Sequence, residues 1–320
     1  MTVIPPTETV ALAEGSPIAR DVTEARTPVN SENEFVRIGR RRILIRRFLR
    51  NRSAIAGSII FLLIVAFSVF GGLLTPYTYD QPDFLALTRP PDAQHWLGTT
   101  SGGNDLLAEV VHALRRSLVI AVSVSVITII LSALIGAGAA YLGGHIEQIA
   151  LAVIHFLLVV PSFLILALVS FRAGGDWRVL IVVLAVFGWM GTARVIWSVS
   201  TSLRARDYVQ MAELMGVSGP RIIVRHIIPN LGSLLVVNVT LGIVSTVLTE
   251  TSLSFLGFGI KPPDVSLGVM LQDGSAALTT APWIFLVPAT VLVLLTVSVT
   301  LVGDGLRDAL DPNTARGGTR

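Results

Sequence analysis

The fold is decided by the stretch RDYVQMAELMGVSGPRIIVRHIIPN, from Arg206 to Asn230, a polar interruption between two long apolar runs. Asp207 is a favourable helix N-cap, and Gln210 stands three residues on, where a capping box places Gln or Glu. Gly216 occupies the position at which a left-handed glycine ends a helix. The stretch therefore predicts a short helix from about Tyr208 to Met215.

The predicted helix has one apolar stripe. Its members recur at i, i+3, i+4 and i+7 and are Tyr208, Met211, Ala212 and Met215. Gln210, Glu213 and Leu214 fall elsewhere around the helix. Because helices shorter than roughly 12–15 residues are marginal alone in water, we expect the stripe to be buried against another surface. That surface can belong to this chain, as in an ordinary loop between helices, or to another protein.

The composition places this stretch in a membrane protein. Of 320 residues, 52% are hydrophobic and 14% are charged, whereas soluble domains are about one quarter charged. Bilayer-spanning helices need roughly 20 apolar residues. The candidate spans are Ala54–Leu74, Ser117–Tyr141, Ile149–Phe171, Val179–Ala193, Leu231–Leu248 and Pro282–Gly303. We therefore predict an all-α integral membrane protein with six transmembrane helices, of which the fourth is the shortest.

The positive charges predict the orientation of these spans. Eight arginines lie between Arg37 and Arg52, just before the first span. With the N-terminus inside, sixteen Arg and Lys residues lie near the cytoplasmic ends of spans and six in the outer segments. Because cytoplasmic loops are enriched in these residues, we expect both termini and the loop 206–230 to be cytoplasmic. The basic run before a span indicates a membrane anchor rather than a nucleic-acid site.

The remaining segments complete the domain organisation. Residues 1–53 are expected to form a disordered, Arg-rich cytoplasmic tail, and residues 304–320 a second cytoplasmic tail. Residues 75–116 form an outer segment, in which Asp105 begins an amphipathic helix leading into the second span. Residues 117–303 form a core of five spans. Within it, the Gly- and Pro-rich stretch from Thr249 to Gly274 predicts a short folded excursion on the outer face.

The stretch 206–230 resembles the EAA-x3-G-x9-I-x-LP loop of bacterial ABC-importer permeases. Ala212, Gly216 and Pro229 match that pattern, whereas Gln210, Met211, His226 and Ile228 depart from it. The resemblance implies a permease fold with a cytoplasmic coupling helix docked in a groove of an ATPase. The residues it implicates in coupling are Asp207, Tyr208, Gln210, Met211, Ala212, Met215, Gly216 and Pro229.

Three further motifs are similar to the dipeptide and oligopeptide branch of that family. HWLGTTSGGNDLLAEVVHALRRSL begins at His95, LSFLGFGIKPPDVSLGVMLQDG begins at Leu253, and GDGLRDALDP spans Gly303–Pro312. They occur in the order that the branch has, and they resemble the second, C-type permease chain. The partners implied are a homologous second permease chain, two ABC ATPase subunits or domains, an extracytoplasmic substrate-binding protein and the lipid bilayer, with no nucleic acid.

The residues give little support to catalysis. The chain has no cysteine, and Lys261, its only lysine, does not follow the glycine pattern of a phosphate-binding loop. The five histidines show no metal-ligand spacing, so neither a metal nor a cofactor is expected. We therefore predict a subunit that is not an enzyme and has no ATP site of its own.

Two titratable residues lie in or near the apolar runs. His155 is interpreted as a neutral histidine hydrogen-bonded between helices or as a substrate ligand, and Glu250 as lining the substrate path or as a solvated helix end. The leading hypothesis is a permease half of an ATP-driven peptide importer in the bacterial cytoplasmic membrane. The alternatives are a secondary transporter or channel, a structural membrane subunit, and a permease for nickel complexes or glutathione. An ion-coupled carrier normally has more charge inside its spans than this chain does.

Overall fold

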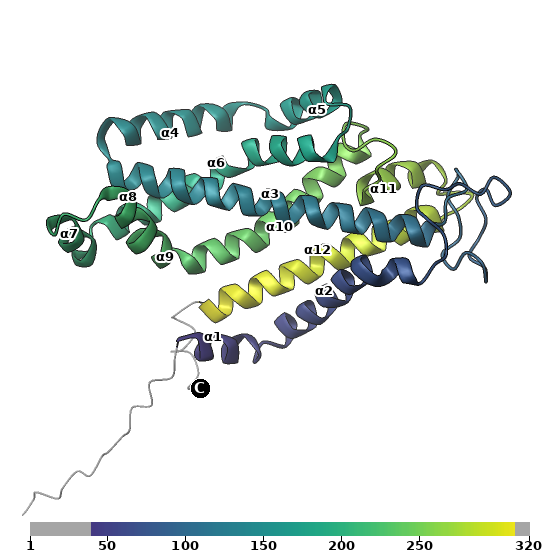
Figure 1. Ribbon diagram of the computed structural model, residues 1–320, viewed down its shortest axis with the longest axis horizontal. Helices are drawn as coiled ribbons and strands as arrows, with labels where there is room; N and C mark the ends of the chain where they lie inside the picture. The colour runs from purple at the N-terminus through teal and green to yellow at the C-terminus, as the bar shows by residue number, and fades with distance from the viewer. Residues whose placement is uncertain (1–39, 311–320) are drawn as a thin grey trace, which may run out of the picture. The chain divides into compact units, whose positions relative to one another are not determined.

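A computed structural model describes residues 40–310 of the chain. The expectations for residues 1–39 and 311–320 lie outside this range. Its α-helices are α1 (Arg40–Phe48), α2 (Arg52–Phe70), α3 (Leu106–Leu142), α4 (Gly144–Val159), α5 (Ser162–Arg172), α6 (Trp177–Arg204), α7 (Asp207–Leu214), α8 (Gly219–Ile222), α9 (Ile228–Asn230), α10 (Gly232–Phe255), α11 (Leu267–Ala276) and α12 (Trp283–Leu310) (Figure 1). Gly71–Leu73 form a 3-10 turn, and Ile223–Ile227 form a π-helical turn.

The all-helical prediction is confirmed for the described residues. Five helices are long and apolar enough to cross a membrane, namely α2 with its 3-10 turn, α3, α6, α10 and α12. The predicted third span, Ile149–Phe171, is not straight, because α4 and α5 meet at an angle of 78°. Pro161 lies at this break, and Val160 before it has an extended backbone with ψ 131°. Proline disfavours a helical residue before it and donates no hydrogen bond, which explains the bend.

Several predicted boundaries are wrong because helices continue beyond the apolar runs. The amphipathic helix after Asp105 and the second span form one helix of 37 residues, α3. The fourth span was expected to be the shortest, yet α6 has 28 residues and reaches Arg204. Residues 40–48 of the tail expected to be disordered form α1, and α12 continues to Leu310 instead of ending near residue 303.

The start of α3 was predicted correctly. The Asp105 carboxylate accepts a hydrogen bond from the Ala108 N–H at 2.9 Å, which satisfies a free donor of the first turn. The other Asp105 oxygen lies 2.9 Å from Nδ1 of the buried His95. The cap therefore also fixes the outer segment to the end of α3.

Helix α3 lies at the centre of the packing. Its N-terminal half packs in an apolar cluster with α2, α10, α11 and α12, around Leu106, Leu114, Leu267 and Leu295. Its other half pairs closely with α6, where the Ser132 hydroxyl donates to the Trp189 carbonyl at 2.7 Å. Small residues permit this approach, as is common where helices pack inside membranes.

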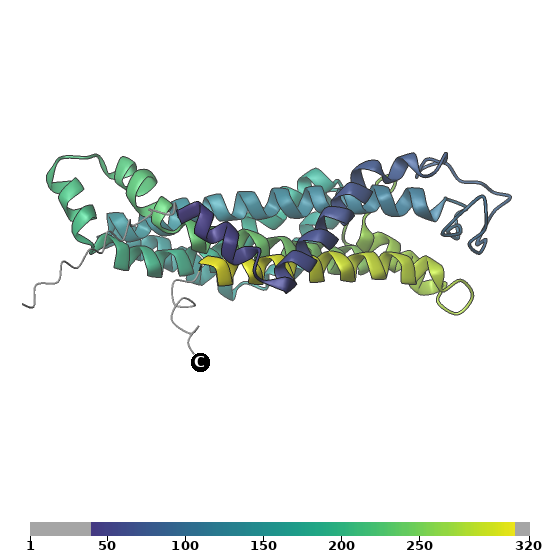
Figure 2. The ribbon, with the colours of Figure 1, turned by 90° about the horizontal axis from the view of Figure 1, so that it is seen from below.

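The helices place two irregular regions at opposite ends. α7 and α8 lie at one end, and α11 with the segment 74–105 lies at the other (Figures 1 and 2). The stretch from Thr249 to Gly274 contains the last turns of α10, a loop and the first turns of α11. It is a folded excursion, as predicted, and its N-terminal part is a continuation of the fifth span.

Candidate functional site

The ends of α7 are set by local backbone geometry. Arg206 is the N-cap and makes no side-chain cap hydrogen bond, so the capping box predicted at Asp207 does not form. Asp207 instead lies in the first turn, where its negative charge is favourable with the helix dipole. Gly216 has φ 77°, as predicted, and its N–H donates to the Glu213 carbonyl at 2.9 Å. The Val217 N–H donates to the Ala212 carbonyl at 3.1 Å, which completes a Schellman motif.

The predicted stripe of α7 is divided between two faces. Ala212 is 3% exposed, and Val209, which was not assigned to the stripe, is fully buried. Both pack in a cluster with Tyr141 of α3 and Ile222 of α8. Placing Ala212 on a surface for another protein was therefore wrong, because the chain itself covers this face.

The opposite side of α7 is apolar and open. We define the exposed α7 face by its four apolar residues, which are Tyr208, Met211, Leu214 and Met215. Leu214 was not assigned to the stripe, yet at 82% exposed it is the least buried of the four. A helix of this length needs other surfaces to pack against, and the buried face of α7 already packs against its own chain. An apolar group of this kind on a loop beyond the spans indicates a surface for another protein.

The segment after α7 extends this region. Pro220, Arg221, Val224, Arg225 and Pro229 line a shallow groove. Pro229 lies in α9, just after the π-helical turn, and is exposed. Asp207 and Gln210 are also exposed. Of the eight residues predicted for coupling, the structure therefore leaves six at the surface, buries Ala212 and uses Gly216 for the backbone turn.

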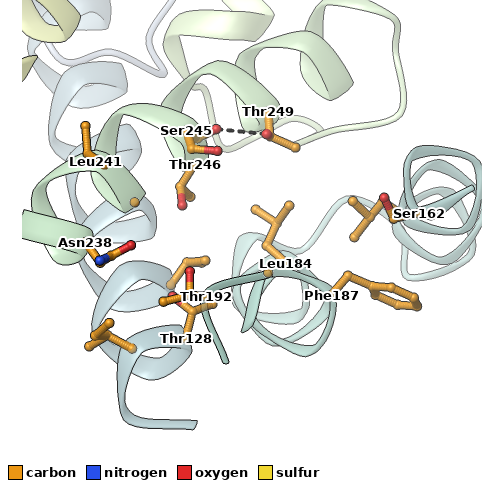
Figure 3. A pocket seen from close by; sticks show the side chains of 15 residues that line it. Thr128, Ser162, Leu184, Phe187, Thr192, Asn238, Leu241, Ser245, Thr246 and Thr249 are labelled. Atoms are coloured by element: carbon orange, nitrogen blue, oxygen red, sulfur yellow. Dashed lines mark hydrogen bonds between the residues drawn. The ribbon is translucent and has the colours of Figure 1, made fainter. Parts of the chain in front are cut away.

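A cavity of about 370 Å³ lies between α3, α5, α6 and α10 (Figure 3). Its polar lining residues all have uncharged side chains and are Thr128, Ser162, Thr192, Asn238, Ser245, Thr246 and Thr249. Within residues 40–310, no charged side chain lines it. Figure 3 shows these residues around a common space, with Leu184 and Phe187 of α6 on one side. Such a cavity offers hydroxyl and amide groups for hydrogen bonds and does not select strongly for charge.

These lining residues were not predicted, although the sequence contains a signal for them. Asn238, Gly242, Ser245 and Thr249 follow one another at i, i+4, i+7 and i+11 in the fifth span. That spacing places them on one face of α10, and all four line the cavity. A polar stripe in an apolar span is the pattern that could have identified the cavity.

Of the two roles predicted for Glu250, the solvated helix end is wrong, and lining of the substrate path stays a prediction. The residue is 1% exposed and is absent from the cavity lining. Its Oε1 accepts a hydrogen bond from the Ser254 hydroxyl at 2.7 Å, and that hydroxyl lies 3.4 Å from the hydroxyl of Ser266, the N-cap of α11. Glu250 is not at a solvated helix end, because α10 continues to Phe255 and the start of α11 folds onto it.

The two roles predicted for His155 stay predictions. It is exposed on α4, a helix in which Ile154 is the buried residue, and it does not line the cavity. Within this chain α4 therefore has one narrow buried side, and His155 lies outside it.

Comparisons with known proteins agree on one family. Residues 129–316 match the model described as binding-protein-dependent transport system inner membrane component, and residues 40–91 match the N-terminal transmembrane domain of oligopeptide transport permease C. The oligopeptide transport system permease protein of Mycobacterium tuberculosis (strain ATCC 25618 / H37Rv) is 46% identical over 85% of this chain and 94% of its own length. The corresponding protein of Escherichia coli (strain K12) is 35% identical over 83% and 89%. A dipeptide transport system permease protein of Bacillus subtilis (strain 168) is 33% identical over 85% of each chain.

Proposed function

Because the chain belongs to the family of binding-protein-dependent transport system inner membrane components, we propose that it is the C-type permease subunit of an ATP-driven oligopeptide importer. Membership makes it a multi-pass membrane subunit, in agreement with its apolar helices. The oligopeptide substrate is proposed from the relatives that are 46% and 35% identical. We place it in a bacterial cytoplasmic membrane with both termini inside.

The observation that carries this proposal is the exposed α7 face. Its four apolar side chains lie at one end of the spans, on a helix whose other face is anchored by Val209 and Ala212. We assign this face to the groove of an ATPase subunit. Since α7 is fixed to α3 and α8, a movement of the ATPase that displaces α7 is transmitted to the spans. The chain thus couples ATP hydrolysis on its partners to the rearrangement of its own helices.

The cavity between α3, α5, α6 and α10 is proposed to form this chain's half of the translocation path. A second, homologous permease chain supplies the other half, and an extracytoplasmic binding protein delivers the substrate. Peptides of different sequence share their backbone amides, and the uncharged hydroxyl and amide lining can bond to these without selecting a side chain. A secondary carrier would be expected to place ionisable groups along such a path.

The test is uptake by the reconstituted complex. The chain is co-expressed with its partner permease and ATPases, purified in mild detergent and placed in proteoliposomes with ATP inside or outside. Accumulation of a labelled tetrapeptide that requires ATP and the binding protein would support the proposal. Uptake driven by an ion gradient without ATP would contradict it. Nickel or glutathione supplied in place of the peptide separates the alternative substrate classes.

A variant of the cavity lining is measured in the same uptake experiment. Asn238→Leu removes an amide from the lining at similar side-chain volume. We expect at least a tenfold loss of peptide uptake with the ATPases still bound, because Asn238 lines the cavity and is not part of the exposed α7 face. Gln148→Leu is the matched control, since Gln148 is an exposed amide residue in α4 and does not line the cavity.

A further inference from the structure

A second cavity, of about 650 Å³, lies at the end of the spans opposite α7. Its walls come from the segment 79–104, the first turns of α3, the segment 262–265 and α11. A volume of this size is within the range of about 300–1,000 Å³ that is typical of small-molecule sites. The cavity shares no lining residue with the cavity between α3, α5, α6 and α10.

The lining of this outer cavity is acidic. Asp80, Glu109 and Asp273 contribute three carboxyl groups, and within the described residues no Arg, Lys or His lines it. Two basic groups beside the lining are paired with an acid. Arg116 and His112 both bond to the Asp264 carboxylate, at 2.5 Å and 3.2 Å, and His112 also stacks on Tyr79. The cavity is therefore lined by acidic groups without a basic group, and an ion pair lies beside it.

One of its carboxyl groups has an unused oxygen. Oε2 of Glu109 is buried and has no hydrogen-bond partner among the described residues. A buried polar atom without a partner is costly, and buried groups of this kind are normally bonded. Partial burial also raises the pKa of Asp273 above its ordinary value. A cationic donor in the cavity would give Oε2 of Glu109 a partner.

We propose that the outer cavity binds the ammonium group of a short peptide, with Glu109 and Asp273 as its acceptors. This inference rests on the proposed function for the class of substrate. An ammonium group has three donors and a positive charge, and charge-assisted bonds to carboxylates are the strong ones. A divalent cation fits less well, because no group of three His, Cys, Asp or Glu within residues 40–310 is arranged to hold a metal ion. The cavity would retain the peptide before it enters the translocation path.

The test measures peptide binding to the full chain in lipid nanodiscs by saturation-transfer NMR. The probes are trialanine, N-acetyl-trialanine and N-acetyl-Ala-Lys-Ala. We expect trialanine to bind, N-acetyl-trialanine to bind at least tenfold more weakly, and Glu109→Gln and Asp273→Asn to weaken trialanine binding at least tenfold. Asp83→Asn is the matched control, because Asp83 lies in the same outer segment and does not line the cavity. Retention of the N-acetyl-Ala-Lys-Ala signal would show that a lysine side chain can supply the ammonium group.

Several results would overturn the inference. These are equal binding of trialanine and its acetylated form, unchanged binding by both acidic variants, or no binding to the wild-type chain. If Glu109→Gln does not fold, Asp273→Asn alone decides, because Asp273 is more exposed than Glu109. ATP-dependent uptake by the wild-type complex is measured separately. Peptide uptake without ammonium binding would contradict this inference alone. Loss of all ATP-dependent peptide uptake would contradict the proposed function.

Discussion

Ala212 and Met211 are neighbours in α7 with opposite environments. Ala212 is 3% exposed and contacts the chain's own cluster, whereas Met211 is 60% exposed on the exposed α7 face. A charge at each position therefore has a different physical effect. Inside the cluster it is desolvated without a partner, and on the exposed face it remains in water until another protein covers it.

We expect Ala212→Asp to detach α7 from its own chain, at a cost on the order of several kcal/mol. Hydrogen exchange of the α7 amides should accelerate in the isolated chain. Met211→Asp should leave that exchange unchanged and should lose the ATPases on co-purification. Glu213→Ala, at an exposed site, is the control for both measurements. If Met211→Asp retains the ATPases with normal coupling, the exposed α7 face is not the docking surface.

Asp264 allows a pH-dependent prediction at the same scale. Burial raises the pKa of its carboxyl group, but hydrogen bonds from Arg116 and His112 outweigh this effect and hold the pKa below its ordinary value. A lowered folded-state pKa stabilises the fold above the unfolded-state value of about 3.9, and this contribution is lost as the pH falls through the folded-state value.

We expect Asp264→Asn to lower the free energy of unfolding by about 1–3 kcal/mol at pH 7, because it removes charged hydrogen bonds. The difference from the wild type should shrink as the pH falls below about 4. Thermal midpoints of the detergent-solubilised chain at several pH values give the measurement. An equal difference at pH 7 and at pH 3 would show that the loss is not electrostatic.

Among the elements, the pair α3 and α6 depends on close approach. A Cβ added at Gly136 of α3 would lie 2.5 Å from the Ala193 carbonyl oxygen and 3.0 Å from the Trp197 nitrogen, both in the backbone of α6. Backbone atoms cannot move aside individually, so the two helices would have to separate. Two residues further along, a Cβ at Gly138 would meet no atom within 4 Å.

Gly136→Ala should therefore destabilise the chain by about 1–3 kcal/mol through overpacking. Gly138→Ala is the matched control, and it should be neutral or stabilise α3 by up to about 1 kcal/mol because alanine favours helix. Chemical or thermal unfolding of the isolated chain in detergent compares the two. Equal effects of both variants on stability would mean that α3 and α6 pack less closely than in the structure.

For the whole molecule, the two ends of the spans are expected on opposite sides of the membrane. The chain has no cysteine, so an introduced thiol is its sole label. Leu85 lies in the segment 74–105, at the end of the spans opposite α7, and is 98% exposed. Met215, next to α7, is 76% exposed. These positions report the two ends separately.

In cells that lack the ATPase partners, an impermeant maleimide should label Leu85→Cys from outside. Met215→Cys should be labelled only after the cells are permeabilised, because the arginine distribution predicts a cytoplasmic α7. Labelling of Met215→Cys in intact cells would reverse the proposed orientation.

Features that depend on neighbouring residues were determined by the sequence alone. Gly216 ends α7 and Asp105 starts α3, because both act through hydrogen bonds within a few residues. The apolar runs determined the helical membrane class, and the polar face of α10 was already present in its spacing. Burial was decided only by the tertiary structure. Ala212 is covered by Tyr141 and Ile222, and Glu250 by the start of α11, because a side chain's environment is set by surfaces that are distant in sequence and that the helical period cannot identify.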